Sequence, residues 1–376
     1  MVEIKQVTTK RDLNRFLDFP NQLYRDNPCY VPDMRSDELN NLNPKVNPAF
    51  EHSEAAQWLA LRDGKVVGRV MALVNHNVNA AWGKKQARFS RVDFIDDPEV
   101  SQALLAKVEA WARSKGMEEI VGPMGFCDFD KEGMLVEGFE ELSTFVTYYN
   151  HPYYPRHLDK LGYEKEVDWI EFRLDVPDTV DQKIARIAEI VTKKTGCKLL
   201  EFTNAKDILP WGQAAFSLFN DAYKNLYGFV PLTEKQVQAY IKQFFGFVNP
   251  SFIKAVVDKD NNLAAFAITM PSLSKAMRKC GGRLFPFGFI PVMNAIKKND
   301  TLDMYLVAVK SEYQNLGLYA ILMDAIYREA INKGFKHAES NPELELNEKV
   351  QATWKFFPRR QHRRRRVFIK HLQQPV

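Results

Sequence analysis

The chain has 376 residues, which is enough for two domains of ordinary size with their own cores. Hydrophobic residues make up 45% of it and charged residues 26%, the balance of a soluble globular protein, and no apolar run approaches the length of a transmembrane helix. The first residues carry no apolar signal-peptide core, so we expect a cytoplasmic protein. The 4 cysteines and 7 histidines are scattered, and we predict no metal site.

The formal net charge of +5 is unevenly distributed along the chain. Residues 359–370 hold six arginines and one lysine with no acid between them, which leaves −2 for the rest. Arg363, Arg364, Arg365 and Arg366 could therefore bind RNA, the phosphate of a coenzyme or an anionic membrane surface. Alternatively, they lie on a solvated edge strand, where charges discourage pairing with other chains.

Residues 1–175 predict an alternation of strands and helices. The turn signal Asp63-Gly64 lies between two apolar runs and predicts a hairpin. Asp97 as N-cap and Pro98 as first residue predict the start of a helix. The predicted strands cover residues 58–61, 66–72, 89–95, 120–121 and 169–174, and the predicted helix covers 98–115.

The remaining residues repeat this order, which suggests duplication of one domain. The predicted strands cover 252–257, 263–270, 305–309 and 337–339, and the predicted helices cover 317–332 and 347–355. We therefore expect two domains, over residues 1–175 and 176–376. The second half also has a long apolar loop at 271–301, which is either functional or packed on its own aromatic residues.

The strand at 305–309, the polar loop after it and the helix from Gly317 form a candidate anion site. The loop amides and the positive end of the helix dipole attract an anion, and a glycine lets a phosphate approach the backbone. A strand, a loop with one glycine and a helix are common in α/β proteins, however, and most such units bind nothing.

The corresponding loop of the first half has a different charge. Asp96, Asp97 and Glu99 place three carboxylates there, which would repel a phosphate, and Pro98 removes an amide donor. We therefore predict that only the second half can hold an anionic cofactor.

The second half resembles the GCN5-related N-acetyltransferases, the GNAT superfamily. Their signature, Gln/Arg-x-x-Gly-x-Gly/Ala, is matched from Gln314 onward, except that Tyr319 replaces the final small residue. The resemblance implies a mixed α/β sheet, with acetyl-CoA or another acyl-CoA as cofactor. Asn347 would contact the cofactor arm or cap the next helix. The implied cofactor-binding residues are Val309, Gln314, Asn315, Leu316, Gly317, Leu318, Tyr319 and Asn347.

Over nearly its whole length the chain also resembles a bacterial group of tandem GNAT-like proteins. This implies two GNAT-like domains, of which the first is degenerate. The stretches that carry the resemblance are 30–32, 43–50, 63–69, 122–126, 133–139, 149–154, 345–347 and 366–370.

Acyl transfer to an amine needs a base for the amine and an acid for the leaving thiolate. Glu339 and Glu345, near the expected cleft, are the candidate bases, although each could instead cap or solvate the next helix. Tyr319 is a candidate acid, and core packing would explain it equally well.

We therefore expect an acyl-CoA-dependent N-acyltransferase that acts by direct transfer on a small-molecule or peptide amine. One alternative is a non-catalytic ligand-binding or regulatory protein that retains the fold. Another is an aminoacyl-tRNA-dependent transferase, which would use Arg363–Arg366 to bind nucleic acid.

Overall fold

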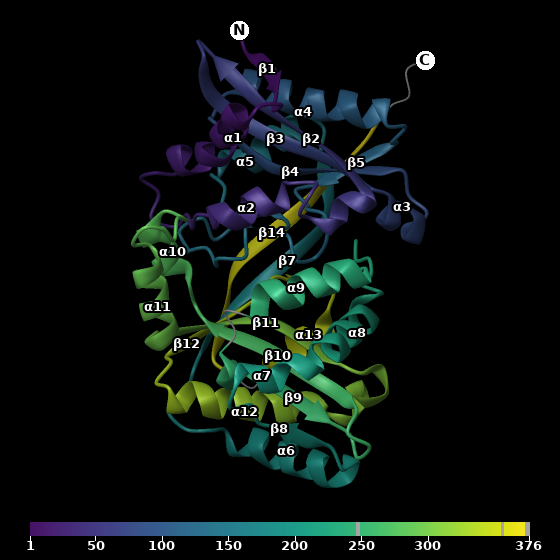
Figure 1. The fold of residues 1–376 in the computed structure, drawn as a ribbon, viewed down its shortest axis with the longest axis vertical. Coiled ribbons are helices and arrows are strands. Elements are labelled where there is room, and N and C mark those ends of the chain that lie inside the picture. The colour runs from purple at the N-terminus through teal and green to yellow at the C-terminus, as the bar shows by residue number, and fades with distance from the viewer. Residues whose placement is uncertain (246–248, 355–356, 373–376) are drawn as a thin grey trace.

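The computed structural model describes residues 1–245, 249–354 and 357–372, which form two halves stacked along the long axis of the molecule (Figure 1). The elements of the first half are β1 (Glu3–Gln6), α1 (Lys10–Leu23), α2 (Arg35–Asn41), β2 (Ser53–Arg62), β3 (Lys65–Asn75), α3 (His76–Trp82), β4 (Gln86–Phe94), α4 (Pro98–Ser114), β5 (Glu119–Gly122), β6 (Met134–Glu137), α5 (Tyr153–Lys160) and β7 (Glu164–Asp175).

The second half follows the same plan with additional helices. Its elements are α6 (Gln182–Thr195), β8 (Lys198–Leu200), α7 (Ala205–Ile208), α8 (Gly212–Tyr223), α9 (Glu234–Phe245), β9 (Ile253–Val257), β10 (Leu263–Pro271), α10 (Ser274–Cys280), α11 (Phe289–Lys297), β11 (Thr301–Val309), α12 (Leu318–Asn332), β12 (His337–Ser340), β13 (Glu343–Leu344), α13 (Glu348–Thr353) and β14 (Arg359–His371).

One mixed sheet runs through both halves in the order β1-β2-β3-β4-β5-β14-β7-β12-β11-β10-β9-β8. The last strands of the two halves exchange places: β7 pairs with β12 of the second half, and β14 pairs with β5 of the first. They also pair with each other, and Figure 1 shows both passing between the halves. Each half of the sheet is thus completed by a strand from the other half of the sequence. The domain boundary that we propose at residue 175 lies at the end of β7.

The turn and the helix cap predicted from the sequence are present in the structure. Asp63 and Gly64 have positive φ angles, 50° and 72°, and join β2 to β3 as a tight hairpin turn. The Asp97 side chain accepts a hydrogen bond from the backbone N–H of Glu99 and caps α4. The helices α4 and α12 each connect two parallel strands, β4 to β5 and β11 to β12. The mixed α/β fold expected from the sequence is therefore confirmed.

Helices cover both faces of the second half of the sheet. The helices α6 and α12 pack together on one face, where Leu302 and Ala338 join Leu322 in a buried apolar cluster. On the other face, α8 packs against β10 and β11, and Phe219 contributes to a cluster with Phe266. Buried apolar side chains thus hold β11 in place from both faces, and β12 from the face of α6 and α12.

Two expectations from the sequence are wrong. The segment at 271–301 is not a loop, because it contains α10 and α11. The arginine-rich strand does not lie at an edge, because β14 is central, between β5 and β7. The predicted helix at 347–355 is the shorter α13, and its predicted end at Lys355 lies outside the described residues.

Candidate functional site

The parallel strands β11 and β12 part halfway along their length. Residues 301–304 of β11 pair with residues 337–340 of β12. Beyond residue 340 the chain continues along β7, with which both β12 and β13 pair, while β11 continues beside β10. Tyr305 is the extra residue of a bulge in β11, where the register against β10 shifts. Within the described residues, the last part of β11 therefore has one edge that no strand covers.

Side chains cover this open edge of β11. Alternate residues of a strand direct their carbonyl groups to the same edge. The three bonds to these carbonyls are Asn341 Nδ2 to Tyr305 O at 2.7 Å, Tyr223 OH to Val307 O at 3.0 Å, and Gln314 Nε2 to Val309 O at 3.2 Å. Since such side chains can rotate away, a ligand with amide groups can replace them along the strand.

The N-terminus of α12 lies directly after this edge. Residues 311–316 form a 3₁₀ helix, and Gly317 follows with a φ of 84°, in the left-handed region that favours glycine. The first turn of α12 has neither an acidic residue nor a side-chain cap. Gln314, Asn315 and Leu316 are exposed. The backbone N–H groups at the start of α12 thus face an environment that suits an anion.

Tyr319 turns its side chain toward the protein interior. Its ring packs edge-on against Trp354, with 6.3 Å between the ring centroids, and its hydroxyl is buried close to Thr353. Burial raises the pKa of Tyr319, so the hydroxyl keeps its proton at neutral pH. The residue that departs from the GNAT signature therefore packs in the core beside the parted strands.

Glu343, which the sequence analysis did not select, lies beside the parting. Its Oε1 accepts a hydrogen bond from Trp354 Nε1 at 2.5 Å, and its Oε2 has no well-formed hydrogen bond among the described residues. Burial raises the pKa of Glu343 to about 8, and the carboxyl is close enough to Tyr223 and Tyr319 to affect the pKa of both. A buried carboxyl with a raised pKa and a free oxygen can exchange a proton near neutral pH.

The two carboxylates predicted as bases are held in ion pairs. Glu339 Oε2 lies 2.9 Å from both Arg363 and His362. Glu345 binds Lys165 at 2.5 Å and Arg364 at 3.0 Å. Both side chains are therefore already engaged by cations.

Asn347, predicted to contact the cofactor or to cap a helix, is the N-cap of α13. Its side chain accepts a hydrogen bond from the backbone N–H of Val350 at 3.4 Å. The capping alternative thus describes its observed contact.

A second carboxyl missed by the sequence analysis is Asp303 on β11. It is 1% exposed, pairs in register with Glu339 on β12, and accepts a weak hydrogen bond from the Tyr305 hydroxyl at 3.4 Å. Burial and the nearby charge of Glu339 raise the pKa of Asp303 to about 7. Neither Asp303 nor Glu343 has a motif in the sequence, because burial by distant elements gives each its unusual pKa.

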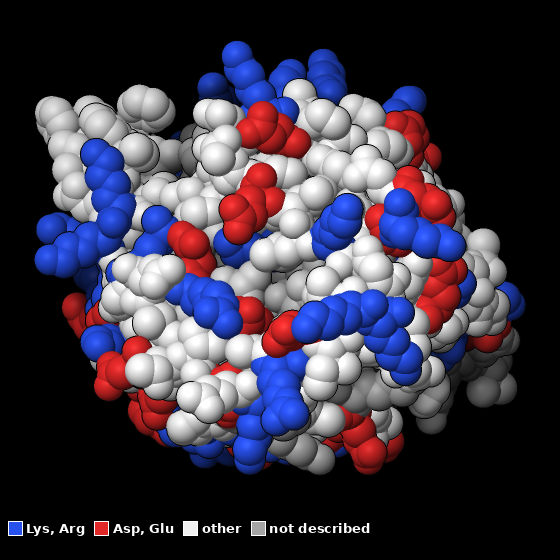
Figure 2. All heavy atoms as spheres, turned by 90° about the horizontal axis from the view of Figure 1, so that it is seen from below, with Lys and Arg blue, Asp and Glu red and all other residues white. Residues whose placement is uncertain are grey.

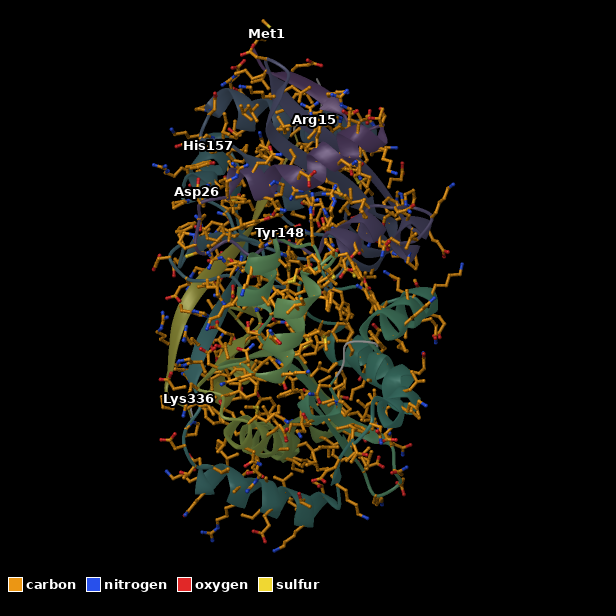
Figure 3. All side chains as sticks on the ribbon, turned by 60° about the vertical axis from the view of Figure 1, so that its left-hand side comes forward. Met1, Arg15, Asp26, Tyr148, His157 and Lys336 are labelled. Atoms are coloured by element: carbon orange, nitrogen blue, oxygen red, sulfur yellow. The ribbon has the colours of Figure 1, made fainter. Side chains whose placement is uncertain are left out.

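The arginine run lies in the centre of the sheet and not on a surface patch. Although burial opposes it, the charges of Arg363 and Arg365 lower the pKa of the buried Glu171 to about 2. Arg365 also donates to the carbonyl of Tyr148, which Figure 3 shows near the level where the halves meet. The ion pairs of the run include Arg363–Glu171, Arg363–Glu339, Arg364–Asp168, Arg364–Glu345, Arg365–Glu171 and Arg366–Asp168.

The corresponding helix of the first half begins among acids. The Asp97 side chain accepts from the N–H of Glu99 at 2.9 Å, and Arg62 binds both carboxylates, at 2.6 and 2.8 Å. Asp96 binds His157 Nε2 at 2.8 Å. The N-terminus of α4 is thus closed by side chains of its own unit.

No protein-family model matches the sequence. The chain is 29% identical over 314 residues to Protein YghO of Escherichia coli (strain K12), covering 83% of this chain and 79% of that protein. It is 25% identical over 363 residues to the bacterial ceramide synthase of Caulobacter vibrioides (strain NA1000 / CB15N), covering 91% and 90%.

Among solved structures, a tandem GNAT protein from the clavulanic acid biosynthesis pathway matches all of both chains, with a TM-score of 0.60 and 13% identity. A GCN5-related N-acetyltransferase from Sphaerobacter thermophilus matches all of this chain and 97% of its own, with a TM-score of 0.52 and 10% identity. These likenesses, together with the repeated order of elements, show that the chain has the tandem GNAT fold, with two GNAT-like units whose last strands are exchanged.

Proposed function

We propose that the protein is an acyl-CoA-dependent N-acyltransferase whose second half binds the acyl donor. The observation that carries this proposal is the parting of β11 and β12 next to the acid-free N-terminus of α12. The open edge of β11 at Val307 and Val309 suits the amides of a pantetheine arm, and the amides that follow Gly317 suit a pyrophosphate. A bound acyl-CoA supplies an activated thioester.

In this proposal Glu343 is the base. The amine must lose a proton as its nitrogen forms the new bond to the acyl carbon and the carbon–sulfur bond breaks. Glu343 Oε2 lacks a well-formed hydrogen bond and can accept this proton. The hydroxyls of Tyr223 and Tyr319, both close enough to feel the Glu343 charge, are the candidates to return a proton to the sulfur.

The relatives suggest the class of acceptor. One is named a bacterial ceramide synthase and matches about nine-tenths of both chains. Ceramides contain an amide bond between a long-chain amino alcohol and a fatty acyl group, which is the bond that the proposed reaction forms. We therefore extend the proposal to a long-chain amino alcohol as acceptor and a fatty acyl-CoA as donor.

Nucleic acid is not included in this proposal. Its local support was the run Arg363–Arg366, and these side chains are paired with acids within the sheet. Exposing them to RNA would separate buried ion pairs, which is costly.

The test is calorimetric binding of acetyl-CoA and octanoyl-CoA to the full chain and to Gly317→Glu. The new carboxylate at the start of α12 should repel the pyrophosphate, so we expect the affinity to fall at least about tenfold. Gly334→Glu is the matched control, because Gly334 also has a positive φ and lies just beyond the other end of α12. Absence of acyl-CoA binding by the unmodified protein, or equal loss in both variants, would contradict the proposal.

A second measurement addresses the acceptor. The full chain is incubated with octanoyl-CoA and either a long-chain amino alcohol or a short amine, and free thiol is followed over time. We expect thiol release with the long-chain acceptor to exceed that with the short amine. If binding is retained but no amine supports thiol release, the acyl-CoA site survives as a ligand-binding site and the transferase proposal fails.

A further inference from the structure

An exposed apolar surface lies on the segment 271–301, called here the α10–α11 segment. The segment connects β10 to β11 along the chain, and it lies on the left side of the molecule in Figure 1. Phe285 is 82% exposed and Phe287 is 72% exposed, and Phe289, Ile290 and Met293 are each more than two-fifths exposed. Aromatic side chains of this size normally bury most of their surface, so such a group of them indicates an interaction site.

The helix α11 is apolar on both sides. One side, with Val292, Ala295 and Ile296, packs in a small core with α10 and with Val31 of the first half. The opposite side presents Phe289, Ile290 and Met293 to solvent, although they have the spacing of a buried helix face. Packing within the protein therefore accounts for only half of the apolar character of α11.

The same segment is strongly positive. It contains six basic residues and one acid, a formal charge of +5, which equals the net charge of the whole chain. Arg278, Lys279, Lys297 and Lys298 are exposed. The arginine run of β14, by contrast, is neutralised by buried acids. Figure 2 shows an uncharged projection, drawn in white, at the upper left with Lys and Arg side chains around its base.

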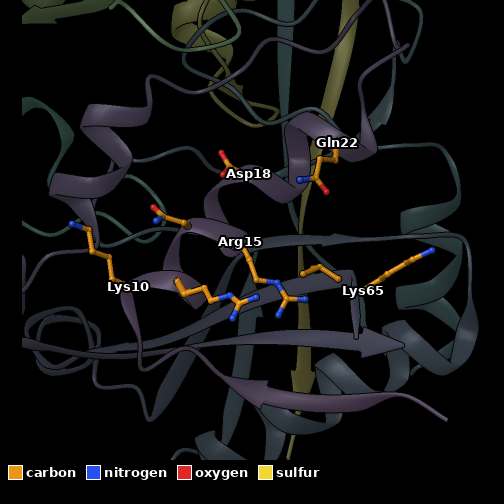
Figure 4. Close-up of a pocket in the computed structure, with 8 residues that line it drawn as sticks. Lys10, Arg15, Asp18, Gln22 and Lys65 are labelled. Carbon is orange, nitrogen blue, oxygen red and sulfur yellow. The ribbon is translucent and has the colours of Figure 1, made fainter. Parts of the chain in front are cut away.

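A basic hollow adjoins the segment on the first half. It has a cavity volume of about 690 Å³, and its lining includes Lys10, Arg11, Arg15 and Lys65 (Figure 4). Asp18, also part of the lining, binds Arg283 of the α10–α11 segment, with 3.1 Å between the charged atoms. The positive surface thus continues from the segment onto α1.

We propose that the α10–α11 segment docks the protein on an anionic lipid bilayer. The exposed aromatic and aliphatic side chains would enter the interface between headgroups and acyl chains, and the surrounding lysines and arginines would contact anionic headgroups. A second copy of the chain fits less well, because two surfaces of the same strong positive charge would face each other. Among the described helices, none has the length and apolar character needed to cross a bilayer. The inference does not depend on the proposed reaction.

The test is vesicle flotation of the full chain with phosphatidylcholine vesicles, alone or with about a third phosphatidylglycerol. We expect binding to the mixed vesicles only, decreasing as salt is added. Phe285→Ser with Phe287→Ser and Phe289→Ser should weaken binding at least tenfold, and so should Lys279→Glu with Lys297→Glu and Lys298→Glu. The second set keeps the apolar residues, so the two sets test separate contributions.

Matched controls lie on the opposite end of the second half. Ile187→Ser with Ile190→Ser on α6, and Lys194→Glu with Lys198→Glu, change exposed residues of the same kinds and should leave flotation unchanged. Circular dichroism and thermal melting check that each variant is folded. The proposal is overturned if the unmodified protein does not float, if the control variants lose binding equally, or if light scattering shows a dimer that the serine variant dissociates.

Discussion

The starts of α4 and α12 show how one fold can treat an anion in opposite ways. Both helices connect parallel strands in the same position of their units. At the start of α4, Asp97 caps the helix and Arg62 joins it to Glu99, so the amides and the positive end of the dipole already have partners. At the start of α12, Gly317 precedes a first turn with no acid. Local side chains, more than the backbone path, decide which unit can receive a phosphate.

The strands that precede these helices, β4 and β11, also differ in how accessible their backbone groups are to a ligand. In the first half, the hydroxyls of Tyr153 and Tyr154 bond to the backbone O and N of Phe94, at 2.6 and 2.9 Å, and Tyr154 is fully buried. In the second half, the side chains over the open edge of β11 include the partly exposed Tyr223 and the exposed Gln314. Tyrosine side chains therefore fill the end of β4 in the first unit. In the second unit, side chains that can rotate away cover the corresponding edge of β11.

The largest expected effect distinguishes Glu343 from the acids predicted by sequence. Glu343→Gln removes the proposed base and should lower kcat/KM by roughly 10²–10⁴-fold. Glu345→Gln is the matched control, since Glu345 is already paired with Lys165 and Arg364, and its loss should change kcat/KM far less. Initial rates of thiol release measure both. A larger effect at Glu345 would assign the chemistry to the residue first predicted.

The pH dependence tests the same assignment. Because the pKa of Glu343 is raised to about 8, the carboxylate needed as base forms only as the pH rises through that value, so kcat/KM should increase up to about pH 8 and then level off. The rising part of the plot of kcat/KM against pH should lie at the same pH for two acceptors of different amine pKa. It should disappear in Glu343→Gln. If the rising part of the plot shifts with the pKa of the amine, the acceptor is titrating and not Glu343.

The pH dependence of the free energy of unfolding also tests the raised pKa of Glu343. A folded-state pKa above the usual 4.5 means that the folded protein holds the proton more tightly than the unfolded chain does. The free energy of unfolding should therefore decline as pH rises from about 4.5 through 8, and Glu343→Gln should reduce that decline. Urea titrations at several pH values measure it. If the free energy of unfolding of the variant declines with pH as steeply as that of the unmodified protein, the carboxyl is not protonated in the folded state.

A smaller effect is expected at the N-cap of α4. Asp97→Ala should lower the free energy of unfolding by about 0.5–2 kcal/mol, because the cap and the bond to Arg62 are both lost. Acyl-CoA affinity should not change. The stoichiometry should stay at one acyl-CoA per chain, since Tyr153 and Tyr154 still fill the first unit. A second bound equivalent would show that the acids alone distinguish the two units.

The smallest effect concerns Tyr223. Tyr223→Phe removes the hydroxyl that occupies the carbonyl of Val307, which then becomes available to a ligand amide. We expect acyl-CoA to bind roughly two- to tenfold more tightly, the range that one hydrogen bond covers. Tyr240→Phe, on the neighbouring helix α9, is the control. Weaker binding in Tyr223→Phe would mean that this hydroxyl contacts the ligand instead of competing with it.

The sequence predicted the elements that depend on local signals. The turn at Asp63-Gly64, the cap at Asp97 and the start of α12 after Gly317 all follow from backbone preferences of a few residues. The cofactor candidates Val309 and Gln314 to Tyr319 came instead from the resemblance to the GNAT signature. Whether they bind acyl-CoA stays a prediction.

What the sequence could not predict depends on partners far along the chain. Glu343 has a raised pKa because it is buried on β13, which pairs with β7, a strand encoded more than 160 residues earlier. The arginine run reads as a free basic patch until Glu171, almost two hundred residues earlier, is placed against it. In the α10–α11 segment, helical spacing was present, but exposure of its apolar face is visible only once the fold is known.

The exchange of β7 and β14 has a consequence for biosynthesis. The first unit is complete on the ribosome except for the strand beside β5, which is encoded after residue 358. Until that strand is made, β5 has an unpaired edge and the acids Asp168 and Glu171 on β7 lack their arginines. The sheet of the first half therefore cannot close until residues 359–371 have been translated, which exposes the nascent protein to aggregation.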